Sequence, residues 1–265
     1  MNKKIFILIS LISFSFLACE DVIEIDLNSV EPRIVIEAKL FDQLYPATVL
    51  ITKTGDFFDT ISYNTISGAE VLITDDSGNV VNIPESDTAG VYQTDFFGEI
   101  GKIYTLTVNS EGETYTSTAE MKPPIKIDSI KAVYHGDEIP YFEEGYELSC
   151  FLKDSVNISE YCMLNLYKNL EKSYNIYLYD DTYTDGSNFE YTFFAENFQI
   201  GDTLVLEVNT CDRGVYDYLY TYAEIASDFF QDSGTPYNPT SNISNDALGY
   251  FGVFSLNGAF MIIEE

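Results

Sequence analysis

Apolar side chains at every second position are the feature that most constrains the fold of this chain. Residues 34–40 and 104–108 both show this spacing, which is typical of β-strands that bury one face. Turn-forming residues follow related stretches at 75–79 and 111–112, which indicates antiparallel hairpins. We therefore expect residues 31–122 to form an antiparallel β-sandwich of immunoglobulin-like architecture.

A pair of prolines separates this domain from a second one. Pro123 and Pro124 form a stiff, extended connector, because each ring fixes its own φ and the second ring restricts the preceding residue. Alternating apolar residues resume beyond them, so we predict a second β-rich domain over 125–265. Within it, apolar residues three and four positions apart indicate one helix at about 212–230, with Asp212 as its N-cap. The expected fold is mainly all-β, with two β-sandwich-like domains and one packed α-helix in the second.

The start of the chain has the features of a secretory signal peptide. Two lysines precede an apolar run that is too short to span a bilayer comfortably, and the small Ala18 precedes Cys19. This arrangement resembles the bacterial lipobox, in which the cysteine is diacylated and becomes the first residue of the mature protein. We therefore expect residues 1–18 to be removed and Cys19 to carry a covalent lipid that anchors the protein in a membrane. The alternative is an ordinary secretory signal with a cysteine near its cut by chance.

Four carboxylates follow this cysteine within the segment 19–30, which we interpret as an acidic tether. Such an acidic start resembles the surface-export signal of Bacteroidetes lipoproteins. We therefore predict an outer-membrane location that faces the cell exterior. The periplasmic face of the outer membrane and a merely solvated tether are the alternatives. The four residues are Glu20, Asp21, Glu24 and Asp26.

The charge balance excludes one class of partner. The chain has 43 acidic and 13 basic residues and a formal net charge of −30. A phosphate backbone is repelled by such a surface, and no basic stripe is present to release counterions, so we expect no nucleic-acid binding. Apolar residues make up 46% of the chain and aromatic residues 15%, which is enough for packed cores.

The sequence offers little material for catalysis. Histidine most often transfers protons near neutral pH, and the chain has one, His135, in a stretch typical of a surface turn. A Gly-x-Ser-x-Gly nucleophile motif is absent. With 43 acids, pairs of carboxylates arise by coincidence. We therefore predict that the protein is not an enzyme, and we assign no catalytic residue.

One acidic loop is a candidate calcium site. Its side-chain oxygens are the hard ligands that Ca²⁺ prefers, and its glycine permits a tight turn. The spacing does not fit an EF-hand, because the third and twelfth positions counted from Asp181 are Tyr183 and Thr192. A solvated acidic hairpin loop is the alternative. The residues of this loop are Asp180, Asp181, Asp185, Gly186, Asn188 and Glu190.

Three cysteines follow Cys19, and an odd number leaves at least one thiol unpaired within the chain. Cys150 and Cys162 each lie in an alternating run, with 154–159 as a turn between the runs, so we predict that they share the buried face of one hairpin. An oxidising compartment permits a disulfide between them, and two small buried thiols are the alternative. The third is Cys211, and no cysteine spacing matches a zinc site.

Two groups of tyrosines are candidates for contact with a ligand or partner. The first group lies close enough in sequence to share a sugar-binding surface, although tyrosine also suits half-buried strand positions. The second recurs at every second position of the predicted helix, which spreads it over more than one face, and exposed aromatic residues suit protein interfaces. The first group is Tyr174, Tyr177, Tyr179, Tyr183 and Tyr191. The second is Tyr216, Tyr218, Tyr220 and Tyr222.

The last apolar stretch contains two glycines that need an explanation. Gly249 and Gly252 flank Tyr250 and Phe251, and a glycine within a strand usually marks a bulge or the close approach of another backbone. We favour a tightly packed closing strand over a docking edge for a barrel, because an apolar strand such as 250–263 is more often central than exposed.

Weak motifs occur in a fixed order along the chain: the opening 19–27, the strands 31–37 and 68–74, the junction 123–130 and the closing motif 238–252. This order resembles a Bacteroidetes outer-membrane lipoprotein family catalogued as domain of unknown function 4249. The resemblance covers nearly the whole mature chain. Members are often encoded beside TonB-dependent outer-membrane receptors, so the resemblance implies an accessory role at a transporter.

The expected function is therefore that of a non-catalytic accessory subunit of a TonB-dependent transporter or related barrel. The lipid on Cys19 would hold it in the outer membrane, and no further cofactor is expected apart from the candidate calcium ion. A free-standing surface binding module or adhesin for a glycan or peptide is the alternative hypothesis.

Overall fold

The computed structural model describes most of the chain after the predicted tether. Cys19 lies outside the described residues, and so does the acidic segment that follows it. No helix within the described part is both long and apolar enough to cross a membrane. The described residues are 31–55, 64–136, 144–156, 158–182, 186–194, 196–228 and 237–264.

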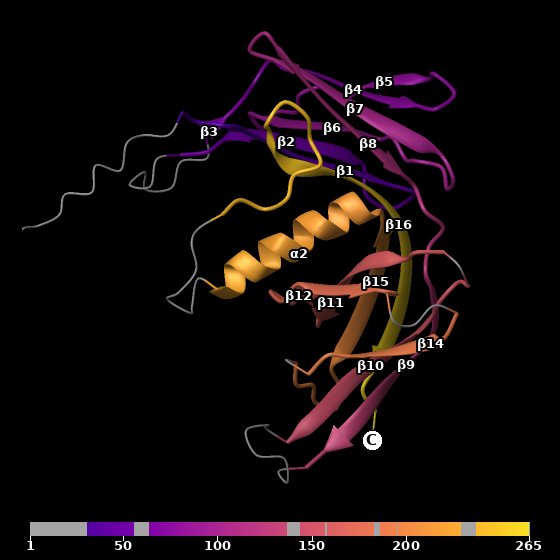
Figure 1. Cartoon of the computed structure of the whole chain (residues 1–265). Helices are drawn as coiled ribbons and strands as arrows, with labels where there is room; N and C mark the ends of the chain where they lie inside the picture. Colours follow the sequence, from indigo (N-terminus) through magenta and orange to yellow (C-terminus); the bar gives the residue numbers. More distant parts are fainter. Residues whose placement is uncertain are drawn as a thin grey trace, which may run out of the picture. The chain divides into compact units, whose positions relative to one another are not determined.

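A nine-stranded sheet connects two regions of the fold, the first over 31–122 and the second from 125 onward (Figure 1). Its strand order is β12-β11-β15-β16-β1-β2-β3, with β13 paired to β11 and β6 paired to β2. The closing strand β16 is central, because it pairs in parallel with β1 and antiparallel with β15. The bounds are β1 Ile34–Phe41, β2 Ala47–Lys53, β3 Asn64–Thr65, β6 Val91–Thr94, β11 Tyr161–Lys168, β12 Glu171–Lys172, β13 Tyr177–Asp180, β15 Thr203–Cys211 and β16 Leu248–Ile262.

Two smaller antiparallel sheets and one helix complete the described fold. The four-stranded sheet has the order β5-β4-β7-β8, and the three-stranded sheet has the order β14-β10-β9. The helix is labelled α2 (Figure 1). The bounds are β4 Glu70–Asp75, β5 Val80–Asn82, β7 Ile103–Ser110, β8 Glu113–Glu120, β9 Lys126–His135, β10 Gly145–Lys153, β14 Asn188–Thr192 and α2 Arg213–Asp228.

The first core lies between the nine-stranded and the four-stranded sheets. Ile36 and Leu40 of β1 are fully buried and belong to one apolar cluster with Ile73 of β4 and Leu106 of β7. Each of these strands buries alternate side chains, as the spacing of two predicts. The predicted mainly β fold with sandwich-like packing is confirmed.

The second core shows that one predicted hairpin is wrong. Cys150 of β10 and Cys162 of β11 are both fully buried in the same cluster, but β10 pairs with β9 and β14, whereas β11 pairs with β12, β13 and β15. The two strands therefore lie in different sheets that face each other across the core. Alternation correctly identified the buried side chains, but it carries no information on which strand supplies the hydrogen bonds. Both thiols, and that of Cys211, are free in the structure.

Helix α2 begins where the sequence predicts. The Asp212 carboxylate accepts a hydrogen bond from the backbone N–H of Val215 at 3.1 Å, which is the expected N-cap contact. The buried face of the helix includes Tyr218, whose ring lies 4.8 Å from that of Tyr250 on β16. The prediction of one packed helix is confirmed for the part of the chain that the structure describes.

The side chains of β16 show which layer covers each face of the large sheet. Phe251 and Val253 belong to the first core, whereas Tyr250 and Phe254 pack with α2. The pairing of β16 with β1 and with β15 carries this alternation across the sheet. The two smaller sheets therefore cover one face, and α2 lies on the opposite face (Figure 1).

Close packing of β1 against β16 explains the glycine at the start of the closing strand. Gly249 has a φ of +98°, and a Cβ atom there would lie 2.1 Å from the carbonyl oxygen of Ile36. The interpretation of a tightly packed closing strand therefore agrees with the structure. The predicted domain division between 122 and 125 stays a prediction, to which the structure adds that the start of β16 pairs with β1 and so completes the sheet of the first region.

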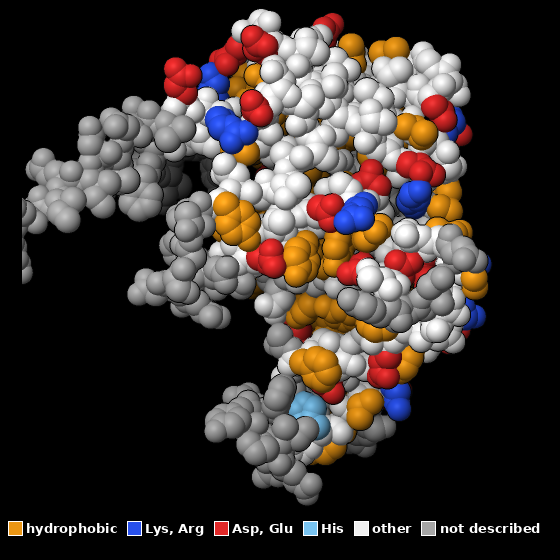
Figure 2. All heavy atoms as spheres, in the orientation of Figure 1, with side chains coloured by type: hydrophobic (Ala, Val, Ile, Leu, Met, Phe, Trp, Pro, Cys, Tyr) orange, Lys and Arg blue, Asp and Glu red, His pale blue; other side chains and the backbone are white. Residues whose placement is uncertain are grey.

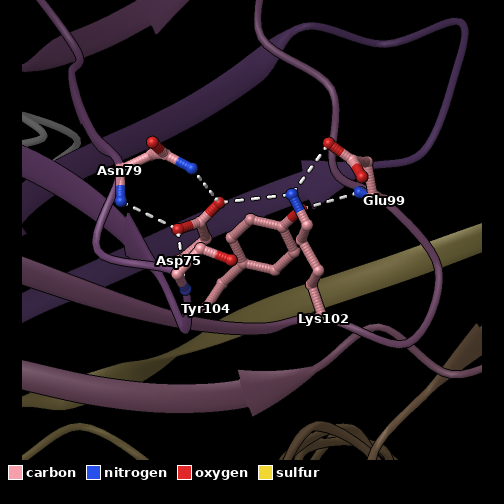
Figure 3. Close-up of polar contacts among 6 residues, drawn as sticks. Asp75, Asn79, Glu99, Lys102 and Tyr104 are labelled. Carbon is pink, nitrogen blue, oxygen red and sulfur yellow. Dashed lines mark hydrogen bonds and ion pairs between the residues drawn. The ribbon is translucent and has the colours of Figure 1, made fainter.

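A polar network holds the predicted turn after β4 (Figure 3). Asp75 accepts hydrogen bonds from the side chain of Asn79 at 2.8 Å and from Lys102 at 3.3 Å. These contacts, led by the one from Asn79, lower the pKa of Asp75 to about 2. Lys102 also pairs with Glu99 at 2.8 Å, and the backbone N–H of Glu99 donates to the hydroxyl of Tyr104 at 2.7 Å. The carboxylate is therefore fixed in its ionised form.

Candidate functional site

The face of the large sheet that carries α2 also contains a cleft. Its volume is about 400 Å³, within the range of small-molecule sites. Strands β1, β2 and β6 supply one side, and β11, β12, β15 and β16 supply the other. Both regions of the fold therefore contribute to it. Figure 2 shows hydrophobic side chains gathered over α2 and the strands below it, with acidic side chains among them. The cleft residues discussed below are Lys39, Phe41, Tyr45, Tyr167, Lys172 and Glu207.

Stacked aromatic rings form one wall of the cleft. The ring of Phe41 lies 5.1 Å from that of Phe254, with 24° between their planes, and Tyr45 meets Phe41 edge-on at 5.1 Å. Gly252 makes room for this arrangement, because a Cβ atom there would lie 2.4 Å from the Phe254 ring. These contacts provide a rigid apolar surface for the ring or hydrocarbon part of a ligand.

A carboxylate at the floor of the cleft is held by three donors. Glu207 on β15 is only 9% exposed. It accepts hydrogen bonds from the hydroxyl of Tyr45 at 2.5 Å, the hydroxyl of Tyr167 at 3.0 Å and the Nδ2 group of Asn165 at 3.4 Å. These bonds compensate its buried charge and fix its orientation.

The same carboxylate keeps the two tyrosines protonated. The pKa of Tyr45 is raised mainly by its hydrogen bond to Glu207, and burial adds to this effect. The pKa of Tyr167 is raised first by burial and then by the charge of Glu207. Both hydroxyls therefore remain hydrogen-bond donors at neutral pH.

Two lysines border the cleft without a carboxylate partner. Lys39 on β1 and Lys172 on β12 both line it, and neither forms an ion pair within the described residues. The pKa of Lys172 is lowered, first by partial burial and second by the charge of Lys39, while Glu207 opposes the change. The two ammonium groups are therefore close enough to repel each other.

A buried amide next to the cleft, that of Asn209, has no hydrogen-bond partner among the described residues. Asn209 lies two residues beyond Glu207 on β15 and opposite Met163 of β11, and both of these neighbours line the cleft. It is 1% exposed, and neither polar atom of its amide has a hydrogen-bond partner among the described residues. Buried polar groups are usually paired, so this position departs from ordinary core packing.

The predicted calcium loop is only partly described. Asp180 accepts hydrogen bonds from the hydroxyl of Tyr216 at 2.8 Å and from the backbone of Thr182 at 3.0 Å. Asp181 is buried and accepts a hydrogen bond from the backbone of Glu160 at 2.9 Å. Asp185 lies outside the described residues. Within the described part of the chain, no group of three or more His, Cys, Asp or Glu side chains is arranged to hold a metal ion, and the calcium site stays a prediction.

The structure does not bring the first group of tyrosines together on one surface. Tyr177 and Tyr179 are buried in the second core, whereas Tyr174 is fully exposed and Tyr183 lies outside the described residues. The lone histidine, His135, ends β9 and does not line the cleft.

The helix tyrosines are spread over more than one face, as the sequence predicts. Tyr218 is buried against β16, whereas Tyr220 and Tyr222 are exposed by nearly half of their surface. Tyr216 lies near the start of the helix and donates to Asp180.

The cleft was not predicted from the sequence. Its polar residues come from strands that are far apart in the chain and from a loop, and each occupies a position that reads as an ordinary solvent-facing site. One signal was available: lysines are rare in this acidic chain, and Lys39 lies at an outward position of a strand whose only other charged residue is Glu37.

Comparison with known proteins identifies a family but no activity. A family described as "Domain of unknown function (DUF4249)" matches residues 20–257. No curated protein matches the chain. Among solved structures, the FN1-FN3 domains of chicken CNTN1 share 12% identity and a TM-score of 0.26, over 68% of this chain and 60% of that chain. The family match extends over most of the sequence, and the chain therefore belongs to the DUF4249 family.

Proposed function

We propose that the protein is a non-catalytic, lipid-anchored binding protein that captures a small ligand in the cleft on the large sheet. The observation that carries this proposal is the combination of an aromatic wall, an anchored carboxylate and two unpaired lysines around one cavity of about 400 Å³. Aromatic surface with a few fixed polar groups is the usual composition of a ligand site.

The same geometry argues against a catalytic role for this cleft. Glu207 is its buried carboxylate, and both of its oxygens already accept hydrogen bonds from tyrosine hydroxyls. Histidine is absent from its lining, and the high pKa values of Tyr45 and Tyr167 keep these hydroxyls from acting as bases near neutral pH. We therefore propose no cofactor other than the lipid on Cys19.

The place of action follows from the start of the chain. A lipid on Cys19 would anchor the protein in the outer membrane of a Bacteroidetes cell, and the acidic residues after it support export to the exterior. The net charge of −30 suits a highly solvated surface. Membership of the DUF4249 family supports a position beside a TonB-dependent transporter or related barrel, as its accessory subunit.

Crosslinking in intact cells tests this assignment. The lipoprotein would be purified in mild detergent, co-purifying proteins identified by mass spectrometry, and exposure measured by protease shaving. We expect one stoichiometric β-barrel partner and removal of the protein by the protease. A Cys19→Ala variant is the matched control, and it should lose both the membrane association and the partner. Recovery of the anchored protein without any barrel would contradict the accessory role.

A free-standing surface binding module or adhesin is the second candidate function. The exposed tyrosines Tyr220 and Tyr222 on α2 and Tyr174 favour it, because aromatic residues are enriched in interfaces. Surface shaving without a barrel partner, together with loss of adhesion to a glycan or peptide matrix when these tyrosines are replaced by serine, would support this candidate.

A further inference from the structure

We infer that the cleft recognises an acidic sugar, a hydroxylated ring that carries a carboxylate, with the carboxylate placed between Lys39 and Lys172. This inference rests on the proposed ligand-capture function and specifies the chemical class of the ligand. Three features of the cleft carry it: the lysine pair, the aromatic wall and the hydrogen-bonding floor.

The lysine pair is unusual because most cations elsewhere in the described fold have carboxylate partners. The chain has 13 lysines and arginines, and two of them, at positions 3 and 4, precede the described residues, which leaves eleven. Six of these eleven form ion pairs with carboxylates. Of the five others, two line this single cleft. Acids outnumber bases by 43 to 13 in the chain, yet neither of these two lysines forms an ion pair within the described residues, so both can pair with a carboxylate of a ligand.

Repulsion between the lysines gives an anion a specific advantage. Lys39 and Lys172 line one cleft, and the charge of Lys39 is, after burial, the second cause of the lowered pKa of Lys172, as expected for two ammonium groups that repel each other. A carboxylate bound between them removes this cost and gains two charge-assisted hydrogen bonds. The carboxylate of Glu207 lines the same cleft and opposes a bound anion, so the two ammonium groups have to outweigh it. Negative charges farther than about 8 Å matter less, because they are screened at physiological ionic strength.

The remainder of the cleft fits a sugar ring better than a purely apolar group. The partly buried ring of Phe41, backed by the buried ring of Phe254, and the exposed ring of Tyr45 offer an aromatic surface for the apolar face of a pyranose. Glu207 and Asn165 also line the cleft. Beyond the bonds that they already form, the carboxylate can accept and the amide can donate a further hydrogen bond to a hydroxyl group, and Gln93 adds another amide. An aromatic acid or an aliphatic anion would displace water from these polar groups without replacing its hydrogen bonds, which costs free energy in a partly buried site.

Calorimetric titration of the full mature lipoprotein in detergent tests the inference. The probes are the trimers of galacturonic acid and of glucuronic acid, and the matched controls are the neutral trimers of galactose and of glucose. We expect at least one acidic probe to bind, its neutral counterpart to bind roughly tenfold or more weakly, and binding to weaken as salt is raised.

Substitutions locate the site. Lys39→Gln and Lys172→Gln should each weaken binding of the acidic probe by about tenfold, the effect of one charge-assisted hydrogen bond. Lys131→Gln is the matched control, because it removes the same charge from an exposed lysine on β9 that lies outside the cleft and forms no ion pair within the described residues. It should leave the affinity unchanged. Circular dichroism would confirm that the variants are folded.

The outcomes separate this inference from the proposed function. Equal binding of acidic and neutral trimers, or equal loss of affinity in all three lysine variants, would overturn the role of the lysine pair. The inference also fails if neither acidic trimer binds. In each of these cases, recovery of a barrel partner in the crosslinking experiment would leave the accessory function standing.

Discussion

The two halves of β16 are similar in sequence and differ in their surroundings. Residues 249–256 are buried on both faces of the sheet, whereas 257–262 alternate between half-buried and exposed positions. Phe254 and Phe260 lie on the same face six residues apart, yet Phe254 is 1% exposed and Phe260 is 61% exposed. Helix α2 and the ring of Phe41 cover the first half only. Burial along this strand is therefore set by the layer above it, and not by the hydrophobicity of its residues.

The two halves of β16 also adjoin cores of different composition. The first half of β16 belongs to a core built mainly of aliphatic side chains, and the second half borders a core richer in aromatic residues and thiols. Side chains of β16 pack in the first core and against the second, so the strand is the place to test whether a disturbance at one core reaches the other. Substitutions along this one strand can therefore measure how independent the two regions are.

The largest expected effect on stability comes from replacing one of two phenylalanines in β16, with the other as its control. Phe254→Ala should lower the free energy of unfolding by about 3–5 kcal/mol, because it leaves a cavity under α2 and removes the stacked contact with Phe41. Phe260→Ala removes the same side chain from an exposed position and should cost within about 0.5 kcal/mol. Urea unfolding followed by circular dichroism measures both. Equal effects would show that the two halves of β16 have the same environment in solution.

A smaller effect is expected from two glycines of the same strand. Gly249→Ala should cost about 3 kcal/mol, because alanine disfavours a φ of +98° and its Cβ would collide with the carbonyl of Ile36. Gly258→Ala is the control, since the nearest atom to its Cβ would be the carbonyl oxygen of Leu206 at an ordinary 3.4 Å. It should change the stability by less than about 1 kcal/mol. A Gly249→Ala protein as stable as the parent would mean that the parallel pairing of β1 with β16 is looser than its geometry indicates.

These contrasts indicate what can be predicted from the sequence and what cannot. The spacing of apolar residues identified the strands, the helix and the N-cap at Asp212, because burial and capping are encoded locally. The pairing of strands was harder to predict, as Cys150 and Cys162 show. Both side chains were correctly predicted to be buried, but their strands do not form a hairpin. A connection that crosses between sheets has no local signature.

The cleft is a further case in which local patterns fail. Lys39 and Lys172 are more than 130 positions apart in the sequence, and only the order of strands in the large sheet brings them to one cavity. Glu207 likewise reads as a solvent-facing residue of an alternating strand, yet it is buried by two tyrosines from other parts of the chain. Predicting this site requires the topology first, because its residues share no motif.

The smallest expected effect is a difference in how two acidic residues, one from each region, change the stability as the pH changes. In the first region, hydrogen bonds to Asp75 lower its pKa to about 2, so its stabilising contribution is present above its unfolded pKa of about 4 and is lost as the pH falls through about 2. In the second region, the pKa of Glu160 is raised, first by burial, and nearby Asp154 adds to the effect. Its contribution is therefore fully present below its unfolded pKa and is lost as the pH rises through the raised value.

Substitution by the matching amide should consequently have opposite signs in the two regions. At pH 7, Asp75→Asn should lower the urea midpoint, because it weakens the contacts with Asn79 and Lys102, and the difference from the parent should shrink towards pH 2. Glu160→Gln should raise the urea midpoint at pH 7, by an increase in the free energy of unfolding within about 1 kcal/mol. It removes a poorly solvated charge and can donate to the buried Oδ1 of Asp154, which has no hydrogen-bond partner among the described residues. Much of this gain should disappear below about pH 4, where the parent carboxyl is itself protonated. A lower midpoint for Glu160→Gln at neutral pH would show that the ionised carboxylate stabilises its surroundings, and the electrostatic difference between the two regions would then be lost.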